Sequence, residues 1–131
     1  MENEAITGIG EIEPGLTLIL QVPDGKNLLV VALGRPIAIT GANRHLIPVS
    51  PMEKRRENGE VEEINLRRIL WLDSSSWIGG NYQMIKGPSW DLKDLIAEAR
   101  FIIPSLPQNF QTLPHETQLE VKNLNLWIAN L

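Results

Sequence analysis

Cysteine is absent from this chain of 131 residues. The absence excludes disulfide bonds, thiol nucleophiles and thiolate-bound zinc or iron–sulfur centres. Stability must then come from a hydrophobic core, and a chain of this length buries roughly two-thirds of its unfolded surface, which is enough for one domain. Cysteine-free composition agrees with a reducing compartment, so we expect a soluble, cytoplasmic protein.

Long apolar runs are missing as well. The longest run, Leu28 to Leu33, is far shorter than the roughly 20 residues that span a bilayer, so we predict no membrane association. The opening stretch "MENEAITGIGEIEPG" is acidic and has no basic n-region, and we do not expect it to be a signal peptide. The net charge of −4 does not attract nucleic acid or anionic membrane over the whole surface.

Aromatic residues are scarce, at 5% of the chain, but they are concentrated. Three of the four tryptophans and the only tyrosine lie in "WLDSSSWIGGNYQMIKGPSW", residues 71–90. The pattern predicts separate structural roles along this stretch. We expect Trp71 to close a strand, 73–76 to form a polar turn, Trp77 and 82–85 to form a second strand, and Trp90 to precede a helix.

The N-terminal half shows the two-residue period of β-strands. Residues 16–22 alternate, Pro23-Asp24-Gly25-Lys26 is typical of a turn, and 28–33 is the continuous apolar run expected of a strand covered on both faces. These features predict a β-hairpin. Further short strands are expected at 37–40 and at 45–49, the latter as an edge strand because it contains Pro48.

The next segment is charged and less regular. Residues 51–63 have almost no apolar anchors, which predicts an exposed loop or a hairpin with its tip at Asn58-Gly59. Residues 64–72 fit either a strand or a helix, and the β-branched and aromatic residues that follow favour the strand.

A helical period replaces the strand period after Pro88. Asp91 is a suitable N-cap, and Pro104 predicts the helix end near Ile102. A proline-rich connector follows, and a second helix is expected from about Leu113, with Thr112 as N-cap. The expected architecture is α+β: an N-terminal antiparallel β-meander or small barrel of about five to six strands, followed by two C-terminal helices packed on the sheet. It forms one domain over 1–131, in which 1–13 could be a flexible acidic segment.

Chemical motifs give little support to catalysis or cofactor binding. The serine run at 74–76 has only His45 and His115 available as a base and matches no nucleophile motif. The Gly79-Gly80-Asn81 triplet lacks a phosphate-binding pattern, and the two histidines have no partner at metal-ligand spacing. We therefore predict no catalytic residue, no cofactor and no metal.

A basic segment is the alternative site. Two basic clusters lie near the aromatic stretch and would form a nucleic-acid interface if the 51–63 segment is a hairpin. The residues predicted for this interface are Lys54, Arg55, Arg56, Arg67, Arg68, Trp77 and Tyr82. Glutamates at 57, 60, 62 and 63 share the segment, and cross-strand ion pairs explain the same pattern without a ligand.

The favoured function is a non-enzymatic protein-interaction module: a small regulator, adaptor or accessory subunit of a larger complex. Its expected binding surface is the apolar helix "VKNLNLWIANL". The predicted partner-binding residues are Leu124, Trp127, Ile128 and Leu131. The alternative in which this helix completes the domain core is left open, as are homo-oligomerisation, an RNA- or DNA-binding function, and a small enzyme with an unrecognised site.

Overall fold

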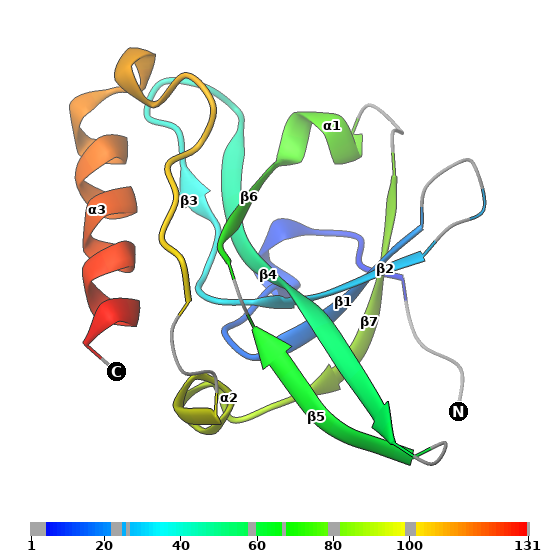
Figure 1. The fold of residues 1–131 in the computed structure, drawn as a ribbon. Helices are drawn as coiled ribbons and strands as arrows, with labels where there is room; N and C mark the ends of the chain where they lie inside the picture. The colour runs from blue at the N-terminus through cyan, green and yellow to red at the C-terminus, as the bar shows by residue number, and fades with distance from the viewer. Residues whose placement is uncertain are drawn as a thin grey trace.

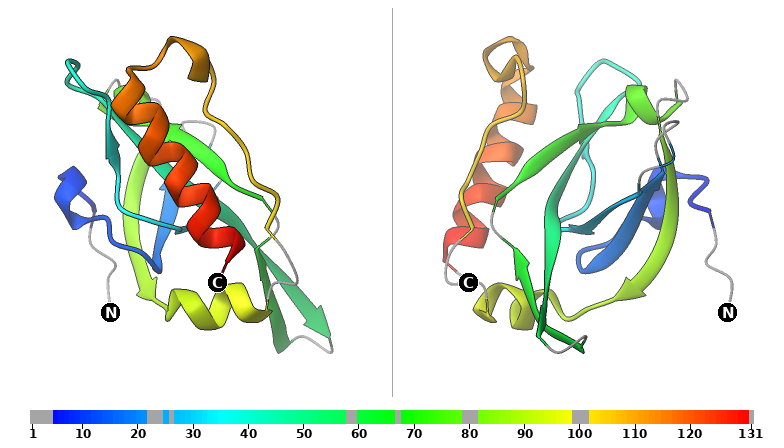
Figure 2. Two further views of the ribbon diagram at one scale, coloured as in Figure 1. Left: turned by 90° about the vertical axis from the view of Figure 1, so that its left-hand side faces the viewer. Right: turned by 45° about the vertical axis from the view of Figure 1, so that its right-hand side comes forward.

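An antiparallel sheet of seven strands forms the centre of this computed structural model (Figure 1). The structure describes residues 5–21, 25, 27–57, 60–66, 68–78, 82–98 and 102–130. The strand order is β3-β4-β2-β1-β7, and β5 and β6 both pair with β4. The sheet is open, so the predicted α+β class is confirmed with an open sheet in place of a small barrel. Helices cover one face of the sheet (Figure 2).

The predicted hairpin is confirmed. β1 (Leu16–Gln21) pairs antiparallel with β2 (Asn27–Ala32), with Leu18 opposite Val30 and Gln21 opposite Asn27. The apolar run in β2 is continuous because its two faces meet different layers. Val30 packs with Leu18 on one face of the sheet, whereas Val31 packs against the helices on the other face. Of the four predicted turn residues, only Gly25 is among those described.

The longest strand is β4 (His45–Glu57), and it pairs with four others. β3 (Ile37–Ala38) lies beside its first residues, and Val49 pairs with Ala32 of β2. The prediction of an edge strand around Pro48 is wrong. The Leu33 N–H donates to the Pro48 carbonyl (2.9 Å) just beyond the end of β2, so the missing N–H of Pro48 falls where the ladder with β2 stops.

The second half of β4 forms the predicted hairpin with β5 (Glu60–Leu66), with Glu57 opposite Glu60. The alternative of an exposed loop is therefore wrong for the described part of 51–63. The tip residues 58–59 lie outside the described part of the chain. The chain continues into β6 (Leu70–Asp73), which pairs with residues 46–49 of β4. The strand predicted for 64–72 is confirmed for 64–66 and 70–72, while Ile69 between them lies in no strand and Arg67 lies outside the described residues.

A short helix, α1 (Ser74–Ile78), replaces the predicted turn and strand at 73–77. The Asp73 carboxylate accepts hydrogen bonds from the Ser75 N–H (2.9 Å) and the Ser75 hydroxyl (2.7 Å). This capping stabilises a helical turn over residues that a propensity pattern assigns to a loop. β7 (Gln83–Ser89) then returns to pair with β1, which confirms the second predicted strand.

Two longer helices follow the sheet. α2 (Leu92–Glu98) begins after Asp91, whose side chain accepts from the Lys93 N–H (3.0 Å), and the predicted N-cap is confirmed. α3 (His115–Ala129) begins after Pro114, not after Thr112, whose hydroxyl instead donates to the Asn109 carbonyl. The connector, which we call the strap (residues 102–109), leads into the 3-10 turn η2 (Phe110–Thr112) and runs alongside α3 (Figure 2).

Both faces of the sheet are covered. One cluster joins β2, α2 and α3 through residues such as Val31, Leu95 and Ile128. On the opposite face, Ile6 and Ile12 pack with β1 and β4, and the Ile6 N–H donates to Met84 of β7 (2.9 Å). Ile6 and Ile12 thus connect the described part of the N-terminal segment to the sheet.

Candidate functional site

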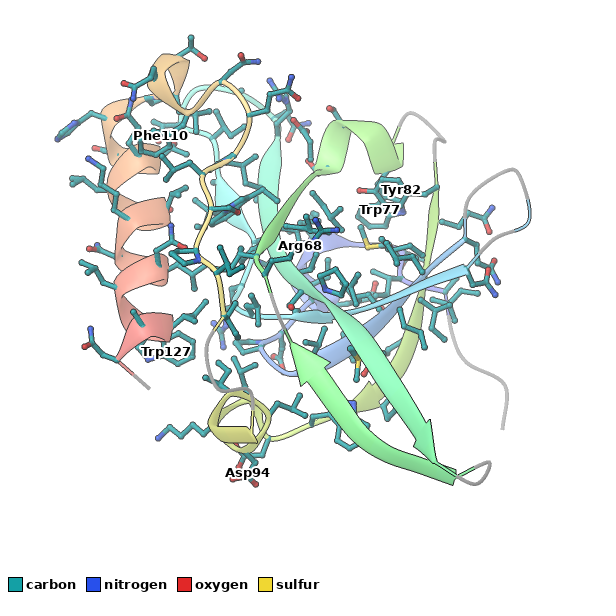
Figure 3. All side chains as sticks on the ribbon, viewed as in Figure 1. Arg68, Trp77, Tyr82, Asp94, Phe110 and Trp127 are labelled. Carbon is teal, nitrogen blue, oxygen red and sulfur yellow. The ribbon has the colours of Figure 1, made fainter. Side chains whose placement is uncertain are left out.

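The predicted partner residues of α3 divide between the core and the surface. Ile128 is 6% exposed and packs with Leu33 and Leu95, and Leu124 is half-buried against the same cluster. Because Ile128 packs inside the domain, its side chain does not form part of the predicted partner surface. Trp127 is 43% exposed and lies at the C-terminal end of the helix (Figure 3). Leu131 lies outside the described residues.

The outer side of α3 carries two leucines that the prediction did not place in a site. Leu119 is 45% and Leu126 62% exposed, and seven residues separate them, so they lie in one line on the helix. Sequence reasoning followed the stripe through Val121 and Ile128 and left Leu126 only as a residue between stripe positions. The sequence feature that indicates this outer line is the seven-residue spacing of Leu119 and Leu126, on the side of the helix opposite the stripe.

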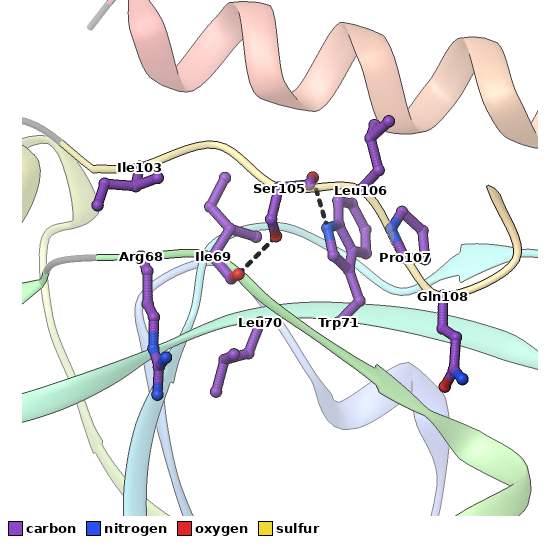
Figure 4. Close-up of a pocket in the computed structure, with 9 residues that line it drawn as sticks. All are labelled: Arg68, Ile69, Leu70, Trp71, Ile103, Ser105, Leu106, Pro107 and Gln108. Atoms are coloured by element: carbon purple, nitrogen blue, oxygen red, sulfur yellow. Dashed lines mark hydrogen bonds between the residues drawn. The ribbon is translucent and has the colours of Figure 1, made fainter.

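The strap is fixed to the domain by specific hydrogen bonds (Figure 4). The Ser105 hydroxyl donates to the Ile69 carbonyl (2.6 Å), and the Ser105 carbonyl accepts from the Trp71 indole (2.9 Å) and the Asn125 amide (3.1 Å). The strap is therefore held against both β6 and α3. Ile103 and Leu106 remain more than half exposed on it.

The strap and α3 together carry a largely apolar surface, which we call the outer face. It consists of the five exposed apolar side chains of the strap and α3, namely Ile103, Leu106, Leu119, Leu126 and Trp127. No charged residue occurs in 102–114 or in 123–130. Among the described residues, only Leu28 and Trp90 are further large exposed apolar side chains. A concentration of exposed apolar area without charge is the composition of an interface core.

The predicted basic surface is only partly described. The backbone of Lys54 to Arg56 lies in the β4–β5 hairpin, where Arg55 stands directly opposite Glu63. Arg67 and the side chains of 54–56 lie outside the described part. Arg68 is exposed at the other end of β5, beyond the pair of Met52 with Leu66.

The two aromatic residues of that prediction face the core more than the solvent. Trp77, which belongs to α1, and Tyr82 are half-buried against the cluster that includes Leu70 and Met84, and their side chains lie together below the α1 ribbon (Figure 3). The Tyr82 hydroxyl donates to the Asp73 carbonyl (3.3 Å). Burial, together with the negative charge of Asp73, raises the pKa of Tyr82 to about 12. A ring held in this way is a poor platform for stacking on a base.

Tyr82 offers a direct check, because it is the only tyrosine in the chain. We expect its phenolate absorbance in the folded protein to appear with a midpoint near pH 12. The same titration in denaturant should give the ordinary value of about 10. The raised pKa favours the neutral phenol in the folded state, so its contribution to stability is complete below about pH 10 and is lost as the pH rises towards 12. A midpoint near 10 while circular dichroism remains native would contradict the buried placement.

The serine run forms part of the structure around Asp73. Asp73 forms an ion pair with Arg44, and this interaction lowers the pKa of the Asp73 carboxyl to about 2. The buried Ser74 hydroxyl accepts from the His45 N–H (2.8 Å), and the Ser75 hydroxyl donates to Asp73. The hydroxyls of Ser74 and Ser75 are therefore engaged in hydrogen bonds that stabilise α1.

Three clefts adjoin these elements in the described part of the chain. The first, of about 330 Å³, lies between β6 and the strap, and Arg68 is its only ionisable lining residue (Figure 4). The hydroxyl of Ser105, another residue that lines this cleft, donates to the Ile69 carbonyl. The residues that line this cleft therefore supply no general base. The second, of about 270 Å³, is lined by Glu13, Arg35 and His45 beside η1 (Ile9–Glu11). The third, of about 400 Å³, lies beside α3 and is lined by Arg35, Glu120 and Trp127 among others.

The chain was compared with protein-family models, with curated proteins and with solved structures. None of the three comparisons gave a match. Function must therefore be inferred from the geometry. Of the helices in the described ranges, none has the length and hydrophobicity to cross a membrane. Over the same ranges, no three His, Asp or Glu side chains are grouped to hold a metal ion.

Proposed function

We propose that this chain is a non-enzymatic protein-interaction module that binds through the outer face. The observation that carries the proposal is the location of the exposed apolar side chains. Five of the seven in the described part of the chain lie on the strap and α3, and all of these five except Leu119 fall in two stretches that contain no charged residue. Isolated exposed leucines are ordinary, whereas a group of them on adjacent elements indicates an interaction site.

Both elements that carry the outer face are fixed to the rest of the domain. α3 is fixed to the sheet by Val121 and Ile128, and the strap is fixed by the hydrogen bonds of Ser105. A partner would meet side chains whose backbone is already ordered, so binding would lose little conformational entropy. A module of this size with one such face suits a regulator, adaptor or accessory subunit.

Site-specific photo-crosslinking in the native host tests the proposal. A photoreactive residue at Leu126 should give covalent adducts with other chains, identified by mass spectrometry. The matched control is the same residue at Leu28, which is also exposed but lies on β2. We expect at least about tenfold more adduct at position 126, because an interface core is desolvated and closely packed. Equal labelling at both positions, or none at 126, would contradict the proposed face.

A further inference from the structure

The outer side of α3 has the residue spacing of a coiled-coil seam. Leu119, Asn123, Leu126 and Asn130 follow one another at intervals of four, three and four residues. These are the intervals between d and a positions of the heptad repeat, so leucine occupies both d positions and asparagine both following a positions. All four residues are exposed.

The same register assigns the opposite side of the helix to the domain. Thr117, Val121 and Ile128 are buried, and they occupy the b and f positions that face away from a seam. The Thr117 hydroxyl donates to the Ala38 carbonyl (3.2 Å) and fixes the helix to β3. α3 is thus bound to its own sheet on one side, while the seam on its other side is exposed, with Asn123 at the edge of a cleft that Arg35 also lines.

We infer that the partner of this seam is a second copy of the chain, with the two α3 helices packed side by side in parallel about a twofold axis. The inference rests on the proposed interaction function and names its partner. The seam is complementary to itself, because each leucine and each asparagine would meet its own copy. A pair of Asn123 side chains that hydrogen-bond across the axis would fix the register of a parallel two-stranded coil. Asn130 is the C-cap of α3, and its amide donates to the Leu126 carbonyl of its own helix (2.7 Å).

The residues beside the seam are also complementary in the parallel arrangement. The g positions hold His115 and Lys122, and the e positions hold Glu120 and Trp127. In parallel helices, a g residue lies near the e residue five positions later in the partner. This pairs His115 with the Glu120 carboxylate of the second copy, and the Lys122 ammonium with its Trp127 ring.

The a positions weaken the arrangement, because asparagine in place of an apolar residue lowers the stability of a coil while it fixes the register. Glu116 occupies the first a position, where it would approach the same residue of the second copy. It lies in the first turn of α3, where the helix dipole favours negative charge and the side chain has access to solvent. The repulsion is therefore expected to weaken the dimer without preventing it.

The available area agrees with a dimer of moderate strength. α3 alone has 15 residues and about four turns, which is short for an isolated coil. The helix is already folded on its domain, however, and the strap adds Ile103 and Leu106 beside it. The a, d, e and g positions between residues 115 and 130 together with these two strap residues supply 12 residues a side, fewer than the roughly 20 of a standard interface, which fits a dimer of moderate strength.

Analytical ultracentrifugation of the purified chain tests the inference. We expect a monomer–dimer equilibrium that depends on protein concentration. Leu119→Lys with Leu126→Lys should raise the dimer dissociation constant at least about 100-fold, because it removes both seam leucines and brings like charges together. Leu28→Lys is the matched control and should leave the constant unchanged. A monomeric wild type, or a double variant that dimerises as well as the control, would overturn the inference.

A cysteine-free chain allows the parallel register to be tested with single cysteines. Asn123→Cys should form an intermolecular disulfide readily under mild oxidation, because parallel register brings the two copies of this residue together. Asp94→Cys, on the exposed side of α2, is the control and should remain largely uncrosslinked. Equal crosslinking of the two variants would overturn the parallel pairing.

The two proposals fail in different ways. If the purified chain is monomeric but the photoreactive residue at Leu126 labels a different protein, the interaction function stands and the second copy is excluded as its partner. If position 126 labels only a second copy and the double variant is monomeric, both proposals stand. If the chain is monomeric and position 126 labels nothing, both fail.

Discussion

Replacement of Ile128 by alanine should lower the free energy of unfolding by about 2–4 kcal/mol, the range for loss of a large aliphatic side chain from a packed core. Ile128 is 6% exposed and lies against the sheet and α2, so the truncation leaves a cavity between layers. Leu126, only two residues away, is 62% exposed, and Leu126→Ala should change stability by no more than about 0.5 kcal/mol. Chemical denaturation of both variants measures the difference.

The comparison of these two variants distinguishes a role of α3 in the domain core from a role as a partner helix. If α3 were primarily a partner helix, Ile128→Ala would weaken binding and leave the isolated protein stable. Removal of 119–131 is expected to abolish folding, since it deletes Val121 and Ile128 together. Equal stability of the Ile128→Ala and Leu126→Ala variants would contradict the packing of α3 described above.

Local sequence patterns predicted those elements that are stabilised by residues close to one another in the sequence. The β1–β2 hairpin follows from alternation and a turn, and the start of α2 follows from a capping side chain at Asp91. The inner stripe of α3 follows from helical periodicity, which correctly marked Val121 and Ile128 as apolar positions on one side. The same periodicity cannot say whether that side meets the chain's own sheet or a partner, because both surfaces are equally apolar.

The features that the sequence did not reveal depend on contacts between distant residues. Pro48 is tolerated inside β4 because the neighbouring strand ends beside it, and α1 exists because Asp73 caps its first turn. The strap is fixed through Ser105, which contacts residues more than 30 positions earlier. The outer face depends on this strap, since Ile103 and Leu106 join α3 only after the connector has been placed.

Gly15 is a further point where distant segments meet, and its conformation explains why it is glycine. Its φ is +89°, its N–H donates to the Ala32 carbonyl (2.8 Å), and its own carbonyl accepts from the Trp90 N–H (2.8 Å). The residue thus joins the start of β1 to the end of β2 and to the corner between β7 and α2. A Cβ atom at this position would overlap the backbone carbonyl of Trp90.

Gly15→Ala should therefore destabilise the protein by more than about 3 kcal/mol, because backbone strain of about 1–2 kcal/mol is added to a clash with rigid backbone. Two controls separate these causes. Gly25 also has a positive φ, but a Cβ there meets no described atom within 4 Å, so Gly25→Ala should cost only the strain. Gly10→Ala has neither penalty and should be nearly neutral. Thermal or chemical unfolding gives the order of the three variants. If Gly15→Ala proved as stable as Gly25→Ala, the close approach of β1 to the β7–α2 corner would be wrong, and with it the placement of α2 beneath the strap and α3.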